Sequence, residues 1–126
     1  MKRKNSLVLD EKDDKAVQIF TELGMPKNLA KTLLYVYQVE ECRSGDIEQG
    51  TDLRQPEVSV ATQELRRRGW VTKRELKKKA KGRPVHIYKP ATHLYDILDA
   101  FGQEKLKEVE RIKNDISELK NLIRSR

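Results

Sequence analysis

Apolar residues recur at helical spacing through the first third of the chain. Asp10 can cap a helix that runs to Leu23, and Gly24 follows as a helix-ending residue. This helix is expected to bury one apolar stripe, formed by Ala16, Ile19, Phe20 and Leu23. Pro26 suits the first turn of a second helix ending near Glu41, because the missing N–H of proline is not needed there. The inner face of that helix is predicted to contain Leu29, Leu33, Val36 and Tyr37, with Ala30 and Leu34 beside it.

Two further helical segments follow, separated by a short turn. Ser44 can cap a short helix that carries Ile47. After a turn at Thr51, a longer helix is predicted over residues 55–68, and Gly69 closes it. The inward positions of this longer helix are expected to be Val58, Ala61, Thr62 and Leu65. Two helices joined by a few turn residues are typical of a helix-turn-helix.

The apolar pattern changes from helical to extended after this helix. Residues 70–76 are predicted to form a strand, and residues 85–88 form the returning strand, which Pro90 stops. The connecting tip, residues 77–84, is polar and basic. A basic hairpin directly after a helix-turn-helix is a wing, so residues 10–90 are predicted to form a winged helix-turn-helix domain that binds DNA.

The chain is predicted to be helical from Thr92 onward. One apolar stripe has the 3, 4, 3 and 4 spacing of a coiled coil and consists of Val109, Ile112, Ile116, Leu119 and Ile123. An earlier stripe consists of Leu94, Leu98 and Phe101. A single helix cannot bury these stripes alone, so residues 91–126 are expected to be a C-terminal helix for dimerisation, and the protein a homodimer. The alternative is a helix that folds back on its own domain. The predicted fold class is mainly α with a small β-hairpin: a winged helix-turn-helix domain plus a long C-terminal dimerisation helix.

Positive charge is concentrated in one segment of the chain. The whole chain has a net charge of +7. Residues 54–89 contain twelve Lys or Arg and three Glu, a net charge of +9, whereas the rest has fifteen basic and seventeen acidic residues, a net charge of −2. Residues 1–9 are expected to be a flexible basic tail. A segment as basic as residues 54–89 is expected where one face of a protein neutralises phosphates, although a solvated charge run would have the same composition.

The residue types that build catalytic, cofactor and metal sites are scarce. Cys42 is the one cysteine, and the two histidines, His86 and His93, lack metal-ligand spacing from it. The sequence contains no phosphate-cradling glycine loop and no nucleophile elbow. No apolar run is long enough to span a membrane, and no signal peptide is recognisable. We therefore expect a soluble, cytoplasmic protein that is not an enzyme and needs no metal or cofactor.

Part of the predicted helix-turn-helix resembles a known group of proteins. The segment Leu53–Ser59 with Leu65, followed by Arg68–Val71, resembles the winged helix-turn-helix of MarR-like regulators and of TrmB-type archaeal regulators. Gly82-Arg83-Pro84 before Tyr88 is similar to the tip and return strand of their wing. The resemblance covers roughly residues 23–90 and implies a transcription regulator that binds double-stranded DNA. MarR-like proteins often hold a small-molecule effector at the dimer junction, and the residues here identify no effector.

The resemblance also implies which residues contact DNA. On the groove-facing side of the recognition helix, residues 55–68, it places Gln55, Pro56, Glu57, Ser59, Val60 and Gln63. The wing would contribute Lys77, Lys78, Lys79, Lys81 and Arg83, and the ends of the helix would contribute Arg54, Arg66 and Arg67. Two roles stay open. Val60 could contact a thymine methyl group or nothing, and Glu57 could accept from cytosine N4 or stabilise the helix N-terminus.

The expected function is sequence-specific binding of double-stranded DNA by a dimeric transcription regulator. The recognition helix would lie in the major groove, where Gln can pair bidentately with adenine and Ser can bond either way. The basic wing, residues 77–84, would contact the backbone or the minor groove. The alternatives are a winged helix used as a protein-interaction subunit and a non-specific nucleic-acid binder. The basic segment disfavours the protein interface, because protein interfaces are depleted in lysine.

Overall fold

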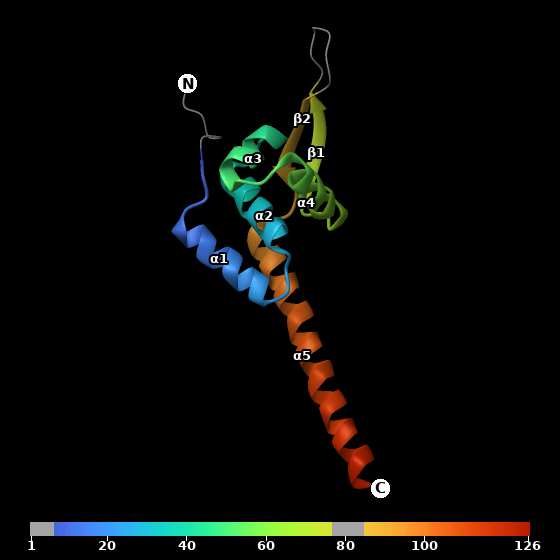
Figure 1. Ribbon diagram of the computed structural model, residues 1–126. Coiled ribbons are helices and arrows are strands. Elements are labelled where there is room, and N and C mark those ends of the chain that lie inside the picture. The colour runs from blue at the N-terminus through green and yellow to red at the C-terminus, as the bar shows by residue number, and fades with distance from the viewer. Residues whose placement is uncertain (1–6, 77–84) are drawn as a thin grey trace. The chain divides into compact units, whose positions relative to one another are not determined.

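The computed structural model describes residues 7–76 and 85–126, which form helices and one β-hairpin (Figure 1). The chain divides into two compact units, Met1–His93 and Leu94–Arg126. The elements of the first unit are α1 (Glu11–Glu22), α2 (Lys27–Val39), α3 (Ser44–Thr51), α4 (Gln55–Arg67), β1 (Val71–Leu76) and β2 (Val85–Pro90). The second unit contains α5 (Leu94–Arg124).

Helix α1 begins at a capping box formed by Asp10 and Asp13. The Asp10 carboxylate accepts hydrogen bonds from the backbone N–H groups of Lys12 (3.0 Å) and Asp13 (3.1 Å). The Asp13 carboxylate accepts one in return from the Asp10 N–H, at 2.9 Å. Because the bond from the Asp13 N–H favours the charged form, the pKa of Asp10 is lowered. Gly24 follows the helix with a φ of 101°, which L side chains rarely adopt. Both predicted ends of this helix are confirmed.

The buried face of α1 differs from the predicted stripe. Phe20 is buried together with Val17, whereas Ile19 and Leu23 are 46% and 45% exposed. Val17 and Phe20 are three residues apart and lie on the side of the helix that packs against α2. The sequence contains two overlapping apolar stripes, and contact with α2 selects the one through Val17. The prediction that Ile19 and Leu23 face inward was therefore wrong.

Helix α2 is the centre of the first unit. It contacts α1, α3, α4 and β2. Its N-cap is Pro26, and it ends at Val39, before Glu40 with a φ of 72°. Neighbours on several sides bury more of this helix than one stripe would, namely Leu29, Ala30, Thr32, Leu33, Tyr35, Val36 and Val39. Tyr37, expected on the inner face, is partly buried, and its hydroxyl group donates a hydrogen bond to the Trp70 carbonyl oxygen at 3.0 Å.

Helices α3 and α4 are joined by a tight turn at Asp52 and Leu53. Asp52 has a left-handed φ of 60°, and Leu53 is buried, as predicted. The N-cap of α3 is Arg43 and not the predicted Ser44, because the Asp46 carboxylate accepts a hydrogen bond from the Arg43 N–H at 2.9 Å. The inward residues predicted for α4 are confirmed as buried: Val58, Ala61, Thr62 and Leu65.

The β-hairpin pairs β1 with β2 in antiparallel register, from Val71 opposite Pro90 to Leu76 opposite Val85. Strand β2 extends to Pro90, two residues beyond the predicted end, because proline without an N–H is acceptable at the last position of a strand. Cys42 bridges to the other edge of β2: its N–H donates to the Tyr88 carbonyl oxygen (3.1 Å), and the Tyr88 N–H donates back (2.8 Å). The base of the hairpin is thereby fixed to the end of α2. The predicted basic tip, residues 77–84, lies outside the described residues.

Helix α5 is a continuous helix of 31 residues. At 1.5 Å per residue its length is about 47 Å. Ile97 and Phe101 are buried, at 1% and 6% exposed. Leu98 is 37% exposed. The five residues with coiled-coil spacing are 47–62% exposed: Val109, Ile112, Ile116, Leu119 and Ile123. We call these five residues the α5 seam.

Replacement of Gly50 by alanine is expected to destabilise the winged-helix unit. A Cβ atom at Gly50 would overlap the fully buried ring of Tyr35 and lie 2.9 Å from the Leu7 carbonyl oxygen. Overpacking of this kind costs about 1–3 kcal/mol in the free energy of unfolding. Gly45→Ala in the same helix is the matched control, because no atom lies within 4 Å of its Cβ. It should stabilise the fold by about 0.4–1 kcal/mol. Urea unfolding would show opposite shifts for the two variants, and equal shifts would contradict this packing.

Candidate nucleic-acid interface

Helix α4 presents one face to solvent. Its exposed side chains are Pro56, Ser59, Val60, Gln63, Arg66 and Arg67, which share one side of the helix because they lie three or four residues apart. Gln55 and Glu57, in the first turn of the helix, are also exposed. The opposite face is held in the core, with Val58 1% and Leu65 0% exposed. Because that face is buried, a molecule that binds to α4 can contact only the exposed side chains.

The carboxylate of Glu57 holds the start of α4 in place. One carboxylate oxygen accepts a hydrogen bond from the Arg54 N–H at 2.9 Å, and the other accepts one from the Asn28 side-chain amide at 3.4 Å. The first bond satisfies a free N–H at the helix N-terminus, and the second joins α4 to α2. Of the two roles left open for Glu57, the structure supports the one at the helix N-terminus.

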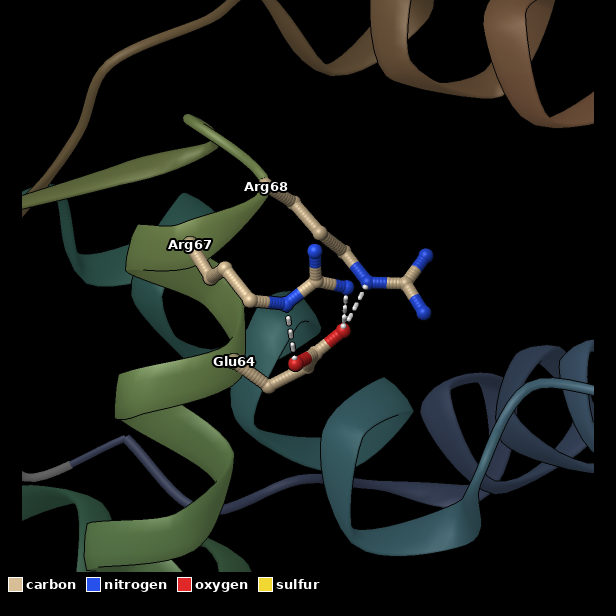
Figure 2. Close-up of polar contacts among 3 residues, drawn as sticks. All are labelled: Glu64, Arg67 and Arg68. Carbon is tan, nitrogen blue, oxygen red and sulfur yellow. Dashed lines mark hydrogen bonds and ion pairs between the residues drawn. The ribbon is translucent and has the colours of Figure 1, made fainter.

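Glu64 binds two of the three arginines at the end of α4 (Figure 2). Its Oε1 accepts from Arg67 Nε at 2.8 Å, and its Oε2 accepts from Arg67 Nη2 at 2.6 Å and from Arg68 Nε at 2.7 Å. These hydrogen bonds, first from Arg67 and then from Arg68, lower the pKa of Glu64 to about 2. The Arg68 guanidinium also lies over the Trp70 ring, 5.0 Å from its centroid. Arg66 forms no ion pair with any residue that the structure describes, so its charge is the one left without a partner at this end of α4.

The described part of the hairpin carries further basic side chains. Arg74 Nη2 lies 3.2 Å from Glu41 Oε1, so this arginine is paired across to the end of α2. Lys73 is exposed and has no ion pair within residues 7–76 and 85–126. The predicted wing contacts lie outside the described residues: Lys77, Lys78, Lys79, Lys81 and Arg83.

Cys42 is buried, and the described part of the chain contains no cluster of metal-binding side chains. Cys42 is 1% exposed, and burial, with a smaller effect from Asp46, raises its pKa to about 12. A buried thiol with that pKa is not a nucleophile. No group of three or more His, Cys, Asp or Glu that could hold a metal occurs among the described residues. No described helix is long and apolar enough to cross a bilayer.

Comparison with known proteins finds similarity of structure without similarity of sequence. No protein-family model and no curated protein matches the chain. TrmBL2, described as an archaeal chromatin protein with a novel mode of DNA binding, matches 88% of this chain with a TM-score of 0.64 and 14% identity, and this chain covers 41% of TrmBL2. A possible transcriptional regulator from Methanosarcina mazei Go1 matches with a TM-score of 0.61, 14% identity and 86% of each chain. A mutant of MarR from E. coli matches with a TM-score of 0.51 and 16% identity, over 91% of this chain and 88% of MarR.

These matches, together with the element order, determine the fold. The chain has a winged helix-turn-helix fold. Helices α3 and α4 form the helix-turn-helix, α4 occupies the position of the recognition helix, and β1 and β2 form the wing. The predicted fold class, mainly α with a small β-hairpin and a long C-terminal helix, is confirmed.

The winged helix also contains an apolar groove that the sequence pattern did not indicate. It has a volume of about 410 Å³, lies between the start of α2 and α4, and is lined by Pro26, Asn28, Leu29, Pro56, Glu57, Val60, Ala61 and Glu64. Val60 is 69% exposed at its wall. The groove results from the crossing of α2 and α4, which no local sequence signal encodes. The contacts of Asn28 and Glu64 were also not predicted, because the geometry of the helices determines which side chains they can bond.

The ion pairs of Glu64 are expected to give it an unusually acidic titration. Because its pKa is lowered to about 2 in the folded protein, from an ordinary 4.5, its stabilising effect is present above the ordinary value and is lost as the pH falls through about 2. NMR of the side-chain carboxyl carbons would measure this pKa directly. Arg67→Gln and Arg68→Gln should each raise it, whereas Arg66→Gln, the matched control, should leave it unchanged. A wild-type Glu64 that titrates near its ordinary pKa would contradict the arrangement in Figure 2.

Proposed function

We propose that this protein is a double-stranded DNA-binding transcription regulator and not an enzyme. The observation that carries the proposal is the exposed polar face of α4, a helix in the recognition position whose other face is fully packed. This face lies within the segment of residues 54–89 that carries a net charge of +9. The similar structures support the same class, since they include an E. coli MarR and a possible regulator from Methanosarcina mazei Go1. No cofactor is needed for this function.

The recognition helix would lie in the major groove and read bases through Gln55, Ser59 and Gln63. All three side chains are polar and exposed, and none of them forms a hydrogen bond or ion pair through its side chain with a described residue. Glutamine can bond bidentately to adenine, and serine can bond to several bases. Val60 on the same face would contact a thymine methyl group. Pro56 would approach the same groove, and Glu57 would act by holding the helix start.

Other basic residues would contact the phosphate backbone and set affinity without reading sequence. Arg66 is the best placed arginine of α4, because Arg67 and Arg68 already bind Glu64. Arg54 at the start of the helix would contact phosphate as well. The wing, residues 77–84, would supply the remaining contacts to the backbone or the minor groove. Each phosphate contact releases counterions, so such binding weakens as salt increases.

The protein would act as a homodimer through the α5 seam. Five aliphatic side chains about half-exposed on one helix are unfavourable in water, since full burial of each is worth about 1.5–3 kcal/mol. A second copy would bury them and would also provide a second recognition helix. Two recognition helices that enter major grooves one turn apart would favour a palindromic site.

A second candidate function is sequence-tolerant binding to double-stranded DNA. TrmBL2, one of the similar structures, is described as a chromatin protein, and this chain has an overall charge of +7. Such a protein would use the same basic residues but would bind all sequences alike. The third class is a winged helix used only for protein contact, and such a protein would not bind DNA.

Selection of bound duplexes from a random DNA pool distinguishes these functions. A sequence-specific regulator should enrich one motif, with two half-sites about one helical turn apart. Retention of DNA without enrichment of any motif would support the sequence-tolerant function and contradict base reading by α4. Absence of retained DNA at low salt would overturn both DNA-binding functions.

Gln55→Ala and Gln63→Ala are expected to change which sequence is preferred. Removal of a bidentate hydrogen-bond pair costs about 1–3 kcal/mol at one base pair and leaves other positions unaffected. The contrasting variant is Lys78→Ala with Lys79→Ala and Lys81→Ala, which should weaken binding to all sequences and reduce the log–log salt slope by about 0.9 for each phosphate that is no longer neutralised. Fluorescence anisotropy with matched and mismatched duplexes measures both effects. Uniform weakening by the glutamine variants would remove them from base recognition.

Ile116→Asp together with Leu119→Asp is expected to produce a folded monomer with much weaker DNA binding. Both side chains are more than half exposed in the single chain, so the charges should disturb pairing and not the fold. Sedimentation equilibrium would follow the association, and circular dichroism would check the helix content. A wild-type protein that is monomeric at micromolar concentration, or a double variant that stays dimeric, would contradict dimerisation through α5.

A further inference from the structure

The residues of the α5 seam follow a heptad repeat. Val109, Ile116 and Ile123 are seven residues apart and occupy the first core position of the repeat, while Ile112 and Leu119 occupy the second. All three first positions are β-branched, and one second position is leucine. In parallel two-stranded coiled coils, β-branched residues are favoured at the first core position and leucine at the second. The pattern of core residues therefore already favours two parallel strands.

The two edges of the seam carry opposite charges. The acidic edge consists of Glu108 and Asp115, each directly before a first core residue. The basic edge consists of Lys113 and Lys120, each directly after a second core residue. Glu108 binds Lys105 at 3.3 Å, but Asp115, Lys113 and Lys120 form no ion pair with any described residue. The charges that border the seam are thus largely unpaired within one chain.

We propose that α5 pairs in parallel with α5 of a second copy, and that the two charged edges select this orientation. The inference rests on the proposed dimer and adds its geometry. In a parallel pair, the acidic edge of each helix faces the basic edge of the other. Glu108 then meets Lys113 of the second copy and Asp115 meets Lys120, each five residues further along. The two-fold symmetry repeats both contacts, so four ion pairs border the seam.

An antiparallel pair would bring like charges together. Reversal of one helix places the acidic edge against the acidic edge of its partner and the two basic edges against each other. The same residues would then form repulsive contacts, which cost about as much as attractive ones contribute. The orientation matters for the proposed function, because a parallel pair joins the two winged-helix units to the same end of the coil.

Disulfide cross-linking of the full chain tests the orientation. In a parallel pair the two copies of residue 123 face each other across the core, at a separation that a disulfide can bridge. In an antiparallel pair, first core positions lie opposite second core positions, as residue 109 opposite residue 119, so the two copies of residue 123 would be separated by about 27 Å along the helices. We expect Ile123→Cys, and separately Val109→Cys, to form covalent homodimers on mild oxidation. Cys42 does not compete, because it is buried.

A mixture of Val109→Cys chains with Leu119→Cys chains provides the opposite test. Residue 109 of one copy meets residue 119 of the other only when the helices run antiparallel, so a parallel pair should yield no mixed disulfide between Leu119→Cys and Val109→Cys chains. Mass spectrometry distinguishes the mixed species if one chain is isotope-labelled. A dominant mixed disulfide would overturn the parallel orientation.

Charge reversal tests whether the two edges are responsible. Lys113→Glu with Lys120→Glu makes every edge acidic and should raise the dimer dissociation constant on the order of tenfold to a hundredfold. Mixing with Glu108→Lys and Asp115→Lys chains should restore tight pairing as a heterodimer. Lys107→Glu with Arg111→Glu, on the outer face, changes the net charge equally and should leave the dimer intact. An equal effect of both pairs would overturn the role of the edges.

The outcomes separate this inference from the proposed function. A wild-type chain that is monomeric by sedimentation would overturn the dimer and the orientation together. A dimer with dominant mixed disulfides would overturn the orientation alone. A parallel dimer that binds no DNA would leave this inference standing and overturn the proposed function.

Discussion

Burial of one face of α4 against its neighbouring helices determines what the rest of the winged helix can do. Val58, Ala61, Thr62 and Leu65 are at most 3% exposed, and α4 contacts both α2 and α3. Because a helix places residues three and four apart on one side, this burial forces Ser59, Val60 and Gln63 outward. The bonds of Glu57 to Arg54 and Asn28 then fix the start of the helix. The set of side chains that α4 exposes therefore follows from packing alone.

The charges of the molecule are arranged consistently with this constraint. Residues 7–53 contain ten acidic and five basic residues, whereas residues 54–89 carry the net charge of +9. Both acidic side chains of α4 bind donors of the same chain. Glu57 accepts from the Arg54 N–H at the helix start, and Glu64 pairs with Arg67 and Arg68. Negative charge next to the proposed DNA surface is thereby directed toward the protein's own donors, which reduces repulsion of phosphate.

The sequence predicted most where local rules decide the outcome. The cap at Asp10, the buried side of α4 and the change to extended structure after Gly69 follow from hydrogen bonding, periodicity and glycine geometry. The prediction was wrong where a contact outside the local sequence pattern decides between two possible arrangements. Contact with α2 selects Val17 over Ile19, and the Asp46 carboxylate moves the cap of α3 to Arg43.

The candidate site shows the same division between local and tertiary signals. The outward residues of α4 were implied by the family resemblance, and they agree with the periodic buried face on the other side of the helix. The pairing of Glu64 with Arg67 and Arg68 was missed, although all three lie within five residues, because three adjacent arginines suggest free charge. The groove beside Val60 depends on how α2 and α4 pack, and no spacing rule predicts it.

The central claim is that the exposed face of α4 meets double-stranded DNA, and NMR titration tests it most directly. Amide and side-chain signals of the labelled protein would be followed as a duplex is added at low salt. The account predicts that the largest changes occur at Ser59, Gln63 and Arg66, while the exposed side of α1, including Ile19, changes little. Large changes on α1 with an unchanged α4 would contradict it.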